Sequence, residues 1–325
     1  MKGTGRMCAN SCPDTIIISG NNNIVNVFPP QAAEKTMQCD TPSFSEFKAI
    51  LQEKKKNALE IQRILSKYYQ KIEKSNKAAH IKACGNYILT RHYNDPAHTN
   101  KLIHANFCKH PLCPMCEWRR CLRQAPAINK ALQMAEGKIY HLTLTYKNSE
   151  TISRADLSKL RHNAVDFLKY YFNCNSYINS IEITYKNKGF HPHIHILMEI
   201  GEELRTDFEA IKDLRESWGE YYPNEYGYCL ATLFPMSNPQ KAAAELSKYI
   251  IKSNDILSAL AVDEIAEAIH GFRKMSAAGN LKDLIKKGKE MIKIENDEEI
   301  ERLKYFSYIE LWHYWKNGAY ETINK

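Results

Sequence analysis

The sequence has 325 residues, of which 44% are hydrophobic and 25% are charged, and its formal net charge is +8. This length can bury a sizeable core and hold two or three modules, and the basic excess suits a polyanionic partner. The longest apolar runs, such as Thr15–Ser19 and Ile194–Met198, are too short to span a membrane. The N-terminus lacks the basic-then-apolar pattern of a secretory signal, so we expect a cytoplasmic protein with no membrane partner.

Residues 1–75 form a predicted N-terminal extension, partly flexible and then helical. Residues 1–42 mix polar, Asn-rich and Pro-bearing stretches without a sustained period. From Ser43 to about Lys77, apolar residues recur at helical spacing among Lys and Glu. The lysine run Lys54–Lys56 in this stretch is typical of a solvated helix face rather than of a dedicated DNA-binding patch.

A cysteine-rich segment follows, and we take residues 76–137 as a separate module. Its Pro and His content argues against long regular elements. Four of the ten cysteines fall within Cys108–Cys121, which indicates metal binding rather than disulfides in a reducing compartment. The Cys-Pro-x-Cys turn from Cys113 to Cys116 spaces two thiolates for tetrahedral zinc. A cluster of free buried thiols is the alternative.

Residues 138–255 have the pattern of an α+β domain. Alternation and helical spacing predict strands over Lys138–Lys147, Tyr177–Lys186, Phe190–Ile200 and Tyr228–Phe234, and helices over Ser153–Phe172, Glu202–Trp218 and Pro239–Lys252. The second and third strands are separated by the short turn Lys186–Gly189, which predicts a hairpin.

Residues 256–325 are charged and form a predicted C-terminal helical region. Four aromatic residues recur there at helical spacing: Tyr305, Tyr308, Trp312 and Trp315. That spacing favours a packing stripe over a base-stacking platform. The lysines of Lys286–Lys289 are again typical of a solvated helix face.

Three histidines lie within five positions of one predicted strand, at His191, His193 and His195. Alternate side chains of a strand share a face, so His193 and His195 project together. Two imidazoles placed in this way can bind one divalent metal ion, whereas a pair of ordinary exposed histidines is the alternative. His191 has the same parity but precedes Pro192 beside the turn, so we consider it the weaker ligand and a candidate DNA contact.

The preceding strand offers a third ligand. Ile181 and Ile183 should face the core, which turns Glu182 to the other face. With the turn centred near Asn187–Lys188, Glu182 should lie almost opposite His193. A carboxylate there would complete a set of two histidines and one glutamate, with open positions for a phosphate and water. A merely solvated Glu182 is the alternative.

A tyrosine and two charged residues share one face of the helix predicted over Pro239–Lys252. Glu245 and Tyr249 are four residues apart, and Lys252 lies three residues beyond Tyr249. A tyrosine hydroxyl, with a pKa near ~10, becomes a competent nucleophile when a metal polarises the phosphate and a cation stabilises the developing charge. Glu245 could serve as general base for a water. The alternative is an amphipathic helix with a partly buried tyrosine, and nothing local singles out Tyr249 among 19 tyrosines.

Four segments taken in order resemble the rolling-circle plasmid replication initiators (Rep) of Gram-positive bacteria, a branch of the HUH endonuclease superfamily. They are Cys84-Gly85 with Phe107–Lys109 and Cys113–Arg120, then Leu142–Thr145, then the Glu182 strand with His191–His195, and finally Glu245 with Tyr249 and Lys252. The likeness continues through Gly271–Lys274 to Gly279 and covers about residues 80–285. The sequence departs from the family at His110, where an arginine is often found, and its N-terminal extension has no counterpart that we recognise.

The resemblance implies a nuclease with one catalytic tyrosine. Tyr249 would be the nucleophile and Glu245 the residue that activates water at termination. His193 and His195 would bind the catalytic Mn²⁺ or Mg²⁺, with Lys252 helping to polarise the scissile phosphate. The expected partners are single-stranded or hairpin origin DNA, a host helicase and the replicative polymerase, and a homodimer is left open.

The resemblance also supplies a distant partner for the clustered cysteines. The preferred ligands of a structural Zn²⁺ are therefore Cys84, Cys108, Cys113 and Cys116, with Cys121 in reserve. Three arginines beside this site could contact DNA phosphates: Arg119, Arg120 and Arg123.

We therefore expect residues 138–255 to form an antiparallel sheet with helices on one face and the metal site on the other, ferredoxin- or RRM-like in plan. The zinc module and helical flanks would complete an HUH endonuclease that nicks a plasmid double-strand origin through a 5′-phosphotyrosine. Two alternatives stay open. An HUH transposase or relaxase would use the same chemistry, although relaxases tend to have a longer histidine set and an N-terminal tyrosine. A non-catalytic, zinc-containing origin-binding regulator would leave the His-x-His strand without a role.

Overall fold

A computed structural model describes residues 44–95, 100–146, 148–186, 189–221, 230–247 and 259–323. Its helices are α1 (Phe44–Lys71), α2 (Ser75–Ala83), α3 (Pro114–Met134), α4 (Arg154–Phe172), α5 (Phe208–Tyr221), α6 (Pro239–Leu246), α7 (Ala259–Ala268) and α8 (Gly279–Leu303). Its strands are β1 (Tyr87–Tyr93), β2 (Asn100–Ala105), β3 (Lys138–Thr145), β4 (Tyr177–Lys186), β5 (Gly189–Ile200), β6 (Ala231–Pro235), β7 (Met275–Ala278), β8 (Tyr308–Lys316) and β9 (Ala319–Ile323).

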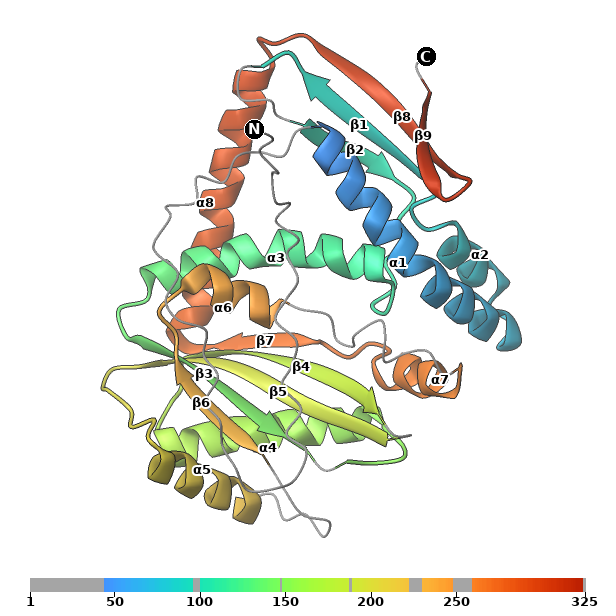
Figure 1. The fold of residues 1–325 in the computed structure, drawn as a ribbon. Helices are drawn as coiled ribbons and strands as arrows, with labels where there is room; N and C mark the ends of the chain where they lie inside the picture. The colour runs from blue at the N-terminus through green and yellow to red at the C-terminus, as the bar shows by residue number, and fades with distance from the viewer. Residues whose placement is uncertain are drawn as a thin grey trace, which may run out of the picture. The chain divides into compact units, whose positions relative to one another are not determined.

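Within these ranges the strands form two antiparallel sheets (Figure 1). The histidine sheet has the strand order β6-β3-β5-β4-β7, and the terminal sheet has the order β2-β1-β8-β9. The α+β class and the antiparallel sheet expected from the sequence are confirmed. In the part of the chain that the structure describes, no helix combines the length and apolar character needed to cross a bilayer.

Local signals place several elements where the sequence predicts them. Helix α4 begins after Ser153, whose hydroxyl accepts a hydrogen bond from the Asp156 N–H, while the Asp156 carboxylate accepts one from the Ser153 N–H at 2.9 Å. This reciprocal capping box satisfies two N–H groups that a helix start leaves without partners. The β4–β5 hairpin pairs Lys186 with Gly189, at the turn that the sequence indicates.

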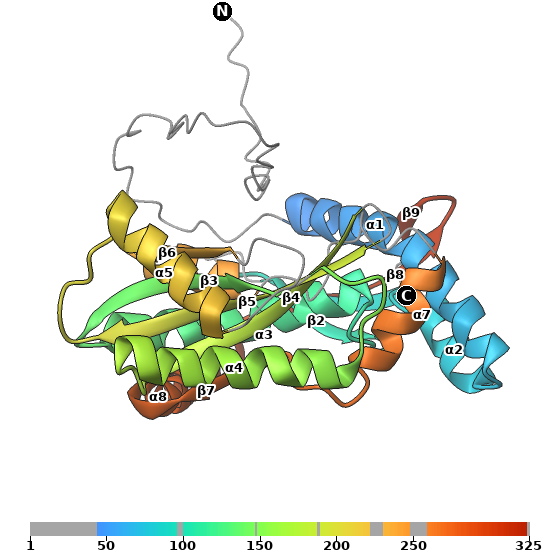
Figure 2. The ribbon, with the colours of Figure 1, turned by 90° about the horizontal axis from the view of Figure 1, so that it is seen from below.

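One face of the histidine sheet is apolar and packs against α4 and α5 (Figure 2). Fully buried side chains from three strands form this face: Leu142, Leu144, Ile181, Ile183, Ile194 and Ile196. From α4, Leu160 and Phe167 belong to the same core, and the Phe167 ring meets Trp218 of α5 edge to face, with centroids 5.2 Å apart. Each buried aliphatic side chain contributes roughly 1.5–3 kcal/mol. A one-residue slip of a strand would exchange its apolar side chains with the polar residues of the other face, so packing determines the register.

The opposite face changes character along the strands. At one end, Ile178 and Leu197 are buried in a second core with side chains of α3, α6 and α8. Figure 1 shows α3 and α6 on this side of the sheet, away from α4 and α5. Further along, the same face carries Ser180, Glu182 and the histidines. The polar face is therefore partly roofed by helices, in addition to the helices that cover the apolar face.

The C-terminal region is not purely helical, contrary to the expectation for residues 256–325. Strand β7 pairs with β4 in the histidine sheet, and β8 pairs with β1, more than 200 positions earlier in the chain. The cysteine-rich module, residues 76–137, likewise contains β1, β2 and the whole 21-residue helix α3, although its composition argues against long elements. The strands β7 and β8 depend on partners that are distant in sequence, which local patterns in residues 256–325 do not reveal.

The helical stripe of aromatic residues predicted for the C-terminal region is wrong, because Tyr308, Trp312 and Trp315 lie on strand β8. Trp315 faces α1, packing near Tyr320 and Leu51. On the other face of the strand, the Trp312 and Tyr314 rings stack with centroids 6.3 Å apart. The aromatic side chains are therefore divided between the two faces of the strand, and only the face with Trp315 packs against α1.

Candidate metal and nucleic-acid site

The pairing of β3, β5 and β4 gathers polar side chains on one face of the histidine sheet. His195 pairs with Ser180 of β4 and with Thr143 of β3, while His193 pairs with Glu182 and Thr145. The register that parity predicts for Glu182 and His193 is therefore present. Because alternate residues share a face, all of these side chains lie on the polar side.

His195 is the centre of a hydrogen-bonded group. Its Nε2 atom lies 3.0 Å from Oε2 of Glu182, and its Nδ1 atom lies 3.2 Å from both Nε2 of His141 and Oγ1 of Thr143. The side chains of His195 and Glu182 are 14% and 11% exposed. The ring of His193 stands edge-on to that of His195, with centroids 6.0 Å apart. Contacts on both ring nitrogens hold His195 in one orientation.

His141 is a member of this group that sequence reasoning missed as a site residue. It occupies β3 at the same parity as Thr143, and its ring centroid lies 5.4 Å from that of His195. The alternation of β3 could have identified it once β3 was known to lie beside β5. His191, by contrast, lies near the hairpin turn and contacts the amide oxygen of Asn148.

The donor set suits a divalent cation that accepts both nitrogen and oxygen ligands, since it combines imidazole nitrogen with carboxylate oxygen. Neighbouring ligands of an octahedral ion with bonds of ~2.1 Å lie about 3.0 Å apart. The 3.0 Å between Glu182 and His195 matches that separation. The ligand atoms of Glu182, His193 and His195 do not all lie within 4.8 Å of one another, a condition that only the cysteine group meets among the described residues.

A cavity of about 330 Å³ reaches the edge strand β7 at Met275 and is lined by three cationic residues, Arg120, Arg273 and Lys274, together with Glu117. Of these, Lys274 interacts electrostatically with Glu182. The backbone oxygen of Lys274 accepts a hydrogen bond from the N–H of Ile181, next to Glu182. Burial lowers the pKa of Lys274 to about 8, while Glu182 and Cys121 counteract part of this shift. Sequence reasoning noted Lys274 only as part of the family likeness.

A buried carboxylate balances part of this charge. Glu117 of α3 is 2% exposed, and its Oε2 atom lies 3.6 Å from Nζ of Lys274, while Oε1 contacts the guanidinium of Arg120. Arg119 instead lies over the ring of Phe107, at 4.5 Å from its centroid. Arg123 is exposed. Of the three arginines expected to contact phosphates, Arg120 therefore has an internal ion pair.

The tyrosine helix is described only in part. Helix α6 ends at Leu246, and its carboxyl end adjoins α3, where the thiol of Cys121 donates to the carbonyl of Ser247. Glu245 lies in the last turn of α6, on the helix that packs over the polar face. Tyr249 and Lys252 lie outside the described residues, so their predicted alignment with Glu245 remains a prediction.

Four cysteines form the second candidate metal site. The Sγ atoms of Cys84 and Cys113, of Cys84 and Cys116, and of Cys108 and Cys116 are each 3.6 Å apart. Thiolates at the corners of a zinc tetrahedron, with Zn–S bonds of ~2.3 Å, lie about 3.8 Å apart, whereas a disulfide needs about 2.05 Å. The geometry therefore fits tetrahedral zinc. All four ligand atoms lie within 4.8 Å of one another, and Cys121 is not among them.

Backbone and side-chain donors also point at these sulfurs. The N–H of Cys108 donates to Sγ of Cys84 at 3.3 Å, and the N–H of Lys109 donates to Sγ of Cys116 at 3.2 Å. The left-handed backbone of Lys109, with a φ of 62°, turns the chain around the site. These contacts suit thiolates bound to a metal.

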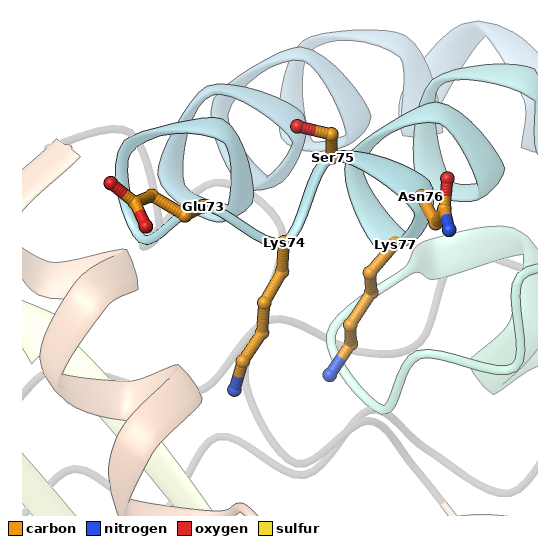
Figure 3. A pocket seen from close by; sticks show the side chains of 5 residues that line it. All are labelled: Glu73, Lys74, Ser75, Asn76 and Lys77. Carbon is orange, nitrogen blue, oxygen red and sulfur yellow. The ribbon is translucent and has the colours of Figure 1, made fainter.

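A separate hollow of about 390 Å³ lies at the turn between α1 and α2. Figure 3 shows Lys74 and Lys77 extending side by side from this turn. Nζ of Lys77 lies 4.1 Å from the ring centroid of Tyr69. The hollow contains none of the residues of either metal site.

The chain matches the model of a family described as replication protein over residues 99–319, more than half of its length. It is 28% identical over 244 residues to a protein named Protein rep of Lentilactobacillus hilgardii, covering 67% of this chain and 77% of that protein. A Protein rep of Bacillus amyloliquefaciens is 24% identical over 304 residues, covering 77% and 88% of the two chains. The chain therefore belongs to the replication protein family, as a plasmid rolling-circle replication initiator of the type found in Gram-positive bacteria.

Proposed function

We propose that this initiator nicks one strand of its plasmid's double-strand origin, with Tyr249 as nucleophile and a divalent metal bound by His193, His195 and Glu182. The observation that carries the proposal is the pairing of β4 with β5, which sets Glu182 opposite His193 and within 3.0 Å of His195. A structural role would not require two histidines and a carboxylate on one polar face. The adjacent cationic cavity supports a phosphate-bearing substrate.

The bound metal, Mn²⁺ or Mg²⁺, would supply Lewis-acid polarisation of the scissile phosphate. The contacts of His195 with His141 and Glu182 hold its ring in place before substrate binds. Such preorganisation lowers the reorganisation that the reaction itself requires. Lys252 would stabilise charge on the phosphate, and Lys274 adds a cation on the side of Glu182.

The chemical step is a transesterification. The Tyr249 hydroxyl oxygen attacks phosphorus and gives up its proton, and a new P–O bond forms to the tyrosine. The bond from phosphorus to the 3′ oxygen breaks, and that oxygen takes up a proton to become the 3′-hydroxyl. The 5′ phosphate stays on the protein, so the energy of the phosphodiester is conserved. At termination, Glu245 would take a proton from water, which then attacks the second scissile phosphate.

The family assignment favours plasmid replication over the transposase and relaxase alternatives. In this function the freed 3′-hydroxyl primes the replicative polymerase, and a host helicase unwinds the duplex. The substrate is single-stranded or hairpin origin DNA, with phosphates bound by residues such as Arg119, Arg123 and His191. We place the reaction in the cytoplasm, with structural Zn²⁺ in the cysteine site and with a homodimer as one assembly to be tested.

The test compares wild type with Tyr249→Phe on supercoiled plasmid that carries the cognate origin, in Mn²⁺. Tyr305→Phe is the matched control, because Tyr305 is 90% exposed and lies outside the site. Wild type and the control should give nicked DNA covalently linked to protein, and Tyr249→Phe should give none. Equal nicking by all three proteins would exclude Tyr249 as nucleophile. Absence of nicking by wild type, with origin binding retained, would favour the non-catalytic regulator.

A further inference from the structure

Lys55 of α1 is fully buried, although the sequence places it in a lysine run typical of a solvated helix face. It has 0% exposure, while the adjacent Lys56 is exposed. Its Nζ atom donates to the carbonyl of Cys84 at 2.5 Å and to Oε1 of Gln62 at 2.9 Å. Among the described residues, Lys55 forms no ion pair with a carboxylate. Burial of an ammonium group is costly unless negative charge lies near it.

The negative charge near Lys55 belongs to the cysteine site. Nζ of Lys55 contacts the carbonyl of Cys84, whose Sγ atom lies 3.6 Å from the Sγ atoms of Cys113 and Cys116. Four thiolates around one Zn²⁺ carry a net charge of about −2, which is unfavourable in a dry interior. An ammonium against the carbonyl of a ligand residue offsets part of that charge. The cation and the metal–thiolate group thus make each other's burial tolerable.

Gln62 lies about two turns further along the same face of α1 and completes the contact. Its Nε2 atom donates to Sγ of Cys113 and to the carbonyl of Cys84, both at 3.3 Å, and its side chain is 2% exposed. A hydrogen bond to a ligand sulfur withdraws charge from it and makes it a poorer base. Gln62 therefore links the ammonium of Lys55, through its Oε1 atom, to a thiolate.

Gly85 and Tyr320 fix the backbone directly after Cys84. Gly85 has a φ of +71°, which turns the chain directly after Cys84. The hydroxyl of Tyr320, on β9, donates to the carbonyl of Gly85 at 2.6 Å. Lys55, Gln62 and Cys84 all precede residue 99, where the family match begins. Helix α1 thus approaches the cysteine site from outside the region that the family model matches.

We propose that Lys55 and Gln62 are outer-sphere positioning residues of the zinc site, and that α1 is a built-in part of the zinc module. This inference rests on the proposed binding of zinc by the four cysteines. Lys55 supplies the counter-charge of the metal–thiolate group, and Gln62 supplies a hydrogen bond to Cys113. Together they slow the loss of zinc.

The test uses the full-length zinc-loaded protein and follows zinc release to the chromogenic chelator 4-(2-pyridylazo)resorcinol. Lys55→Met removes the charge and keeps an apolar stem, and Lys56→Met is the matched control on the same helix. Lys55→Met should release zinc at least about tenfold faster than wild type, in line with the ~10–100-fold effect of outer-sphere changes. Lys56→Met should match wild type. Release from Lys55→Met at the wild-type rate would overturn the proposal.

Two further measurements keep the outcome decisive. In Co²⁺-loaded protein, the sulfur-to-metal charge-transfer band should shift in Lys55→Met but not in Lys56→Met, which a purely structural role would not predict. If Lys55→Met does not fold, Gln62→Met takes its place and should also release zinc faster, and a wild-type rate would then reject the outer-sphere role. Wild-type protein that binds no zinc and shows no Co²⁺–thiolate band would refute the zinc site itself, independently of Lys55.

Discussion

The carboxylate of Glu182 lies 3.0 Å from Nε2 of His195, across the pair of strands β4 and β5. The contact joins two residues that are 13 positions apart in sequence and that occupy the same face of one sheet. On its other side the His195 ring meets His141 and Thr143. A small movement of side chains could thus exchange the Glu182–His195 hydrogen bond for coordination of a shared cation.

Replacement of Glu182 by glutamine should disable the proposed catalytic metal site. The variant keeps the shape of the side chain but loses the negative charge that binds a divalent cation. We expect Mn²⁺-dependent nicking to fall on the order of a hundredfold or more, with a weaker apparent affinity for Mn²⁺. A Mn²⁺ titration of nicking measures both. Glu203→Gln is the control, since its side chain is 78% exposed, and an unchanged Mn²⁺ dependence in Glu182→Gln would rule out Glu182 as a ligand.

Replacement of Glu245 by alanine should separate cleavage from termination. Tyr249 would still attack the origin, so the covalent protein–DNA product should form at near the wild-type rate. The hydrolytic step should slow by roughly 10²–10⁴-fold, because a general base contributes about that much. Labelled oligonucleotides carrying the nick site would follow both steps. If hydrolysis keeps its wild-type rate, Glu245 is not the base.

Loss of one thiolate should empty the structural metal site, whereas loss of the neighbouring cysteine should not. Cys116→Ser should reduce bound zinc from about one per chain to near zero and lower the Tm markedly, since structural zinc binds with ~10–16 kcal/mol in small peptides. Cys121→Ser should retain zinc, because its thiol faces the Ser247 carbonyl. Elemental analysis and thermal unfolding provide the readouts. If Cys116→Ser retains zinc and Cys121→Ser loses it, Cys121 is a ligand in place of Cys116.

Acid should destabilise the protein in part through His313, which is 1% exposed in the terminal sheet. Its Nε2 atom lies 2.8 Å from Oγ1 of Thr90, and its Nδ1 atom lies 2.9 Å from Oγ1 of Thr322. Burial, assisted by Lys48 and His92, lowers its pKa from 6.5 to about 4. Between pH 6.5 and pH 4, His313 therefore stays neutral in the folded state, whereas in the unfolded chain it binds a proton.

This contribution to stability is fully present above pH 6.5 and is lost as the pH falls toward 4. The free energy of unfolding should decrease by up to about 1.4 kcal/mol per pH unit from this residue, and by on the order of 3 kcal/mol over the window. Urea unfolding of wild type and of His313→Gln between pH 7 and pH 4.5 measures the difference. The variant should show a shallower pH dependence, and identical slopes would contradict the assignment.

Gly279 should tolerate no side chain where α8 begins. Its φ is +59°, and an added Cβ would lie 2.5 Å from the carbonyl oxygen of Asn175 and 2.8 Å from Cα of Ser176. Gly318 also has a positive φ, of +80°, but nothing lies within 4 Å of its Cβ position. Gly318→Ala should cost about 1–2 kcal/mol of backbone strain. Gly279→Ala should cost roughly 1–3 kcal/mol more because of the clash, and equal Tm losses would show that the contact relaxes freely.

Local patterns were sufficient for much of the histidine sheet. The alternation around His193 and His195, the Lys186–Gly189 turn and the Ser153 cap each depend on a few neighbouring residues, so β4, β5 and α4 lie where the sequence predicts them. Parity then places Glu182 beside the histidines, because a strand slipped by one residue would bury charge and expose isoleucines.

The sequence by itself thus determined the site strands and their register through periodicities of a few residues, and short spacing indicated a metal site at Cys113 and Cys116. The resemblance to a family was needed to add Cys84, which is distant in sequence. Only the tertiary structure decided which distant segments meet them: His141 beside His195, Lys55 beneath Cys84, and β8 against β1. A lysine run is compatible with a solvated helix face or with a buried lysine, and an aromatic stripe is compatible with a helix or with a strand. Their burial depends on surfaces supplied by residues far away in the chain, and no local pattern encodes that partner.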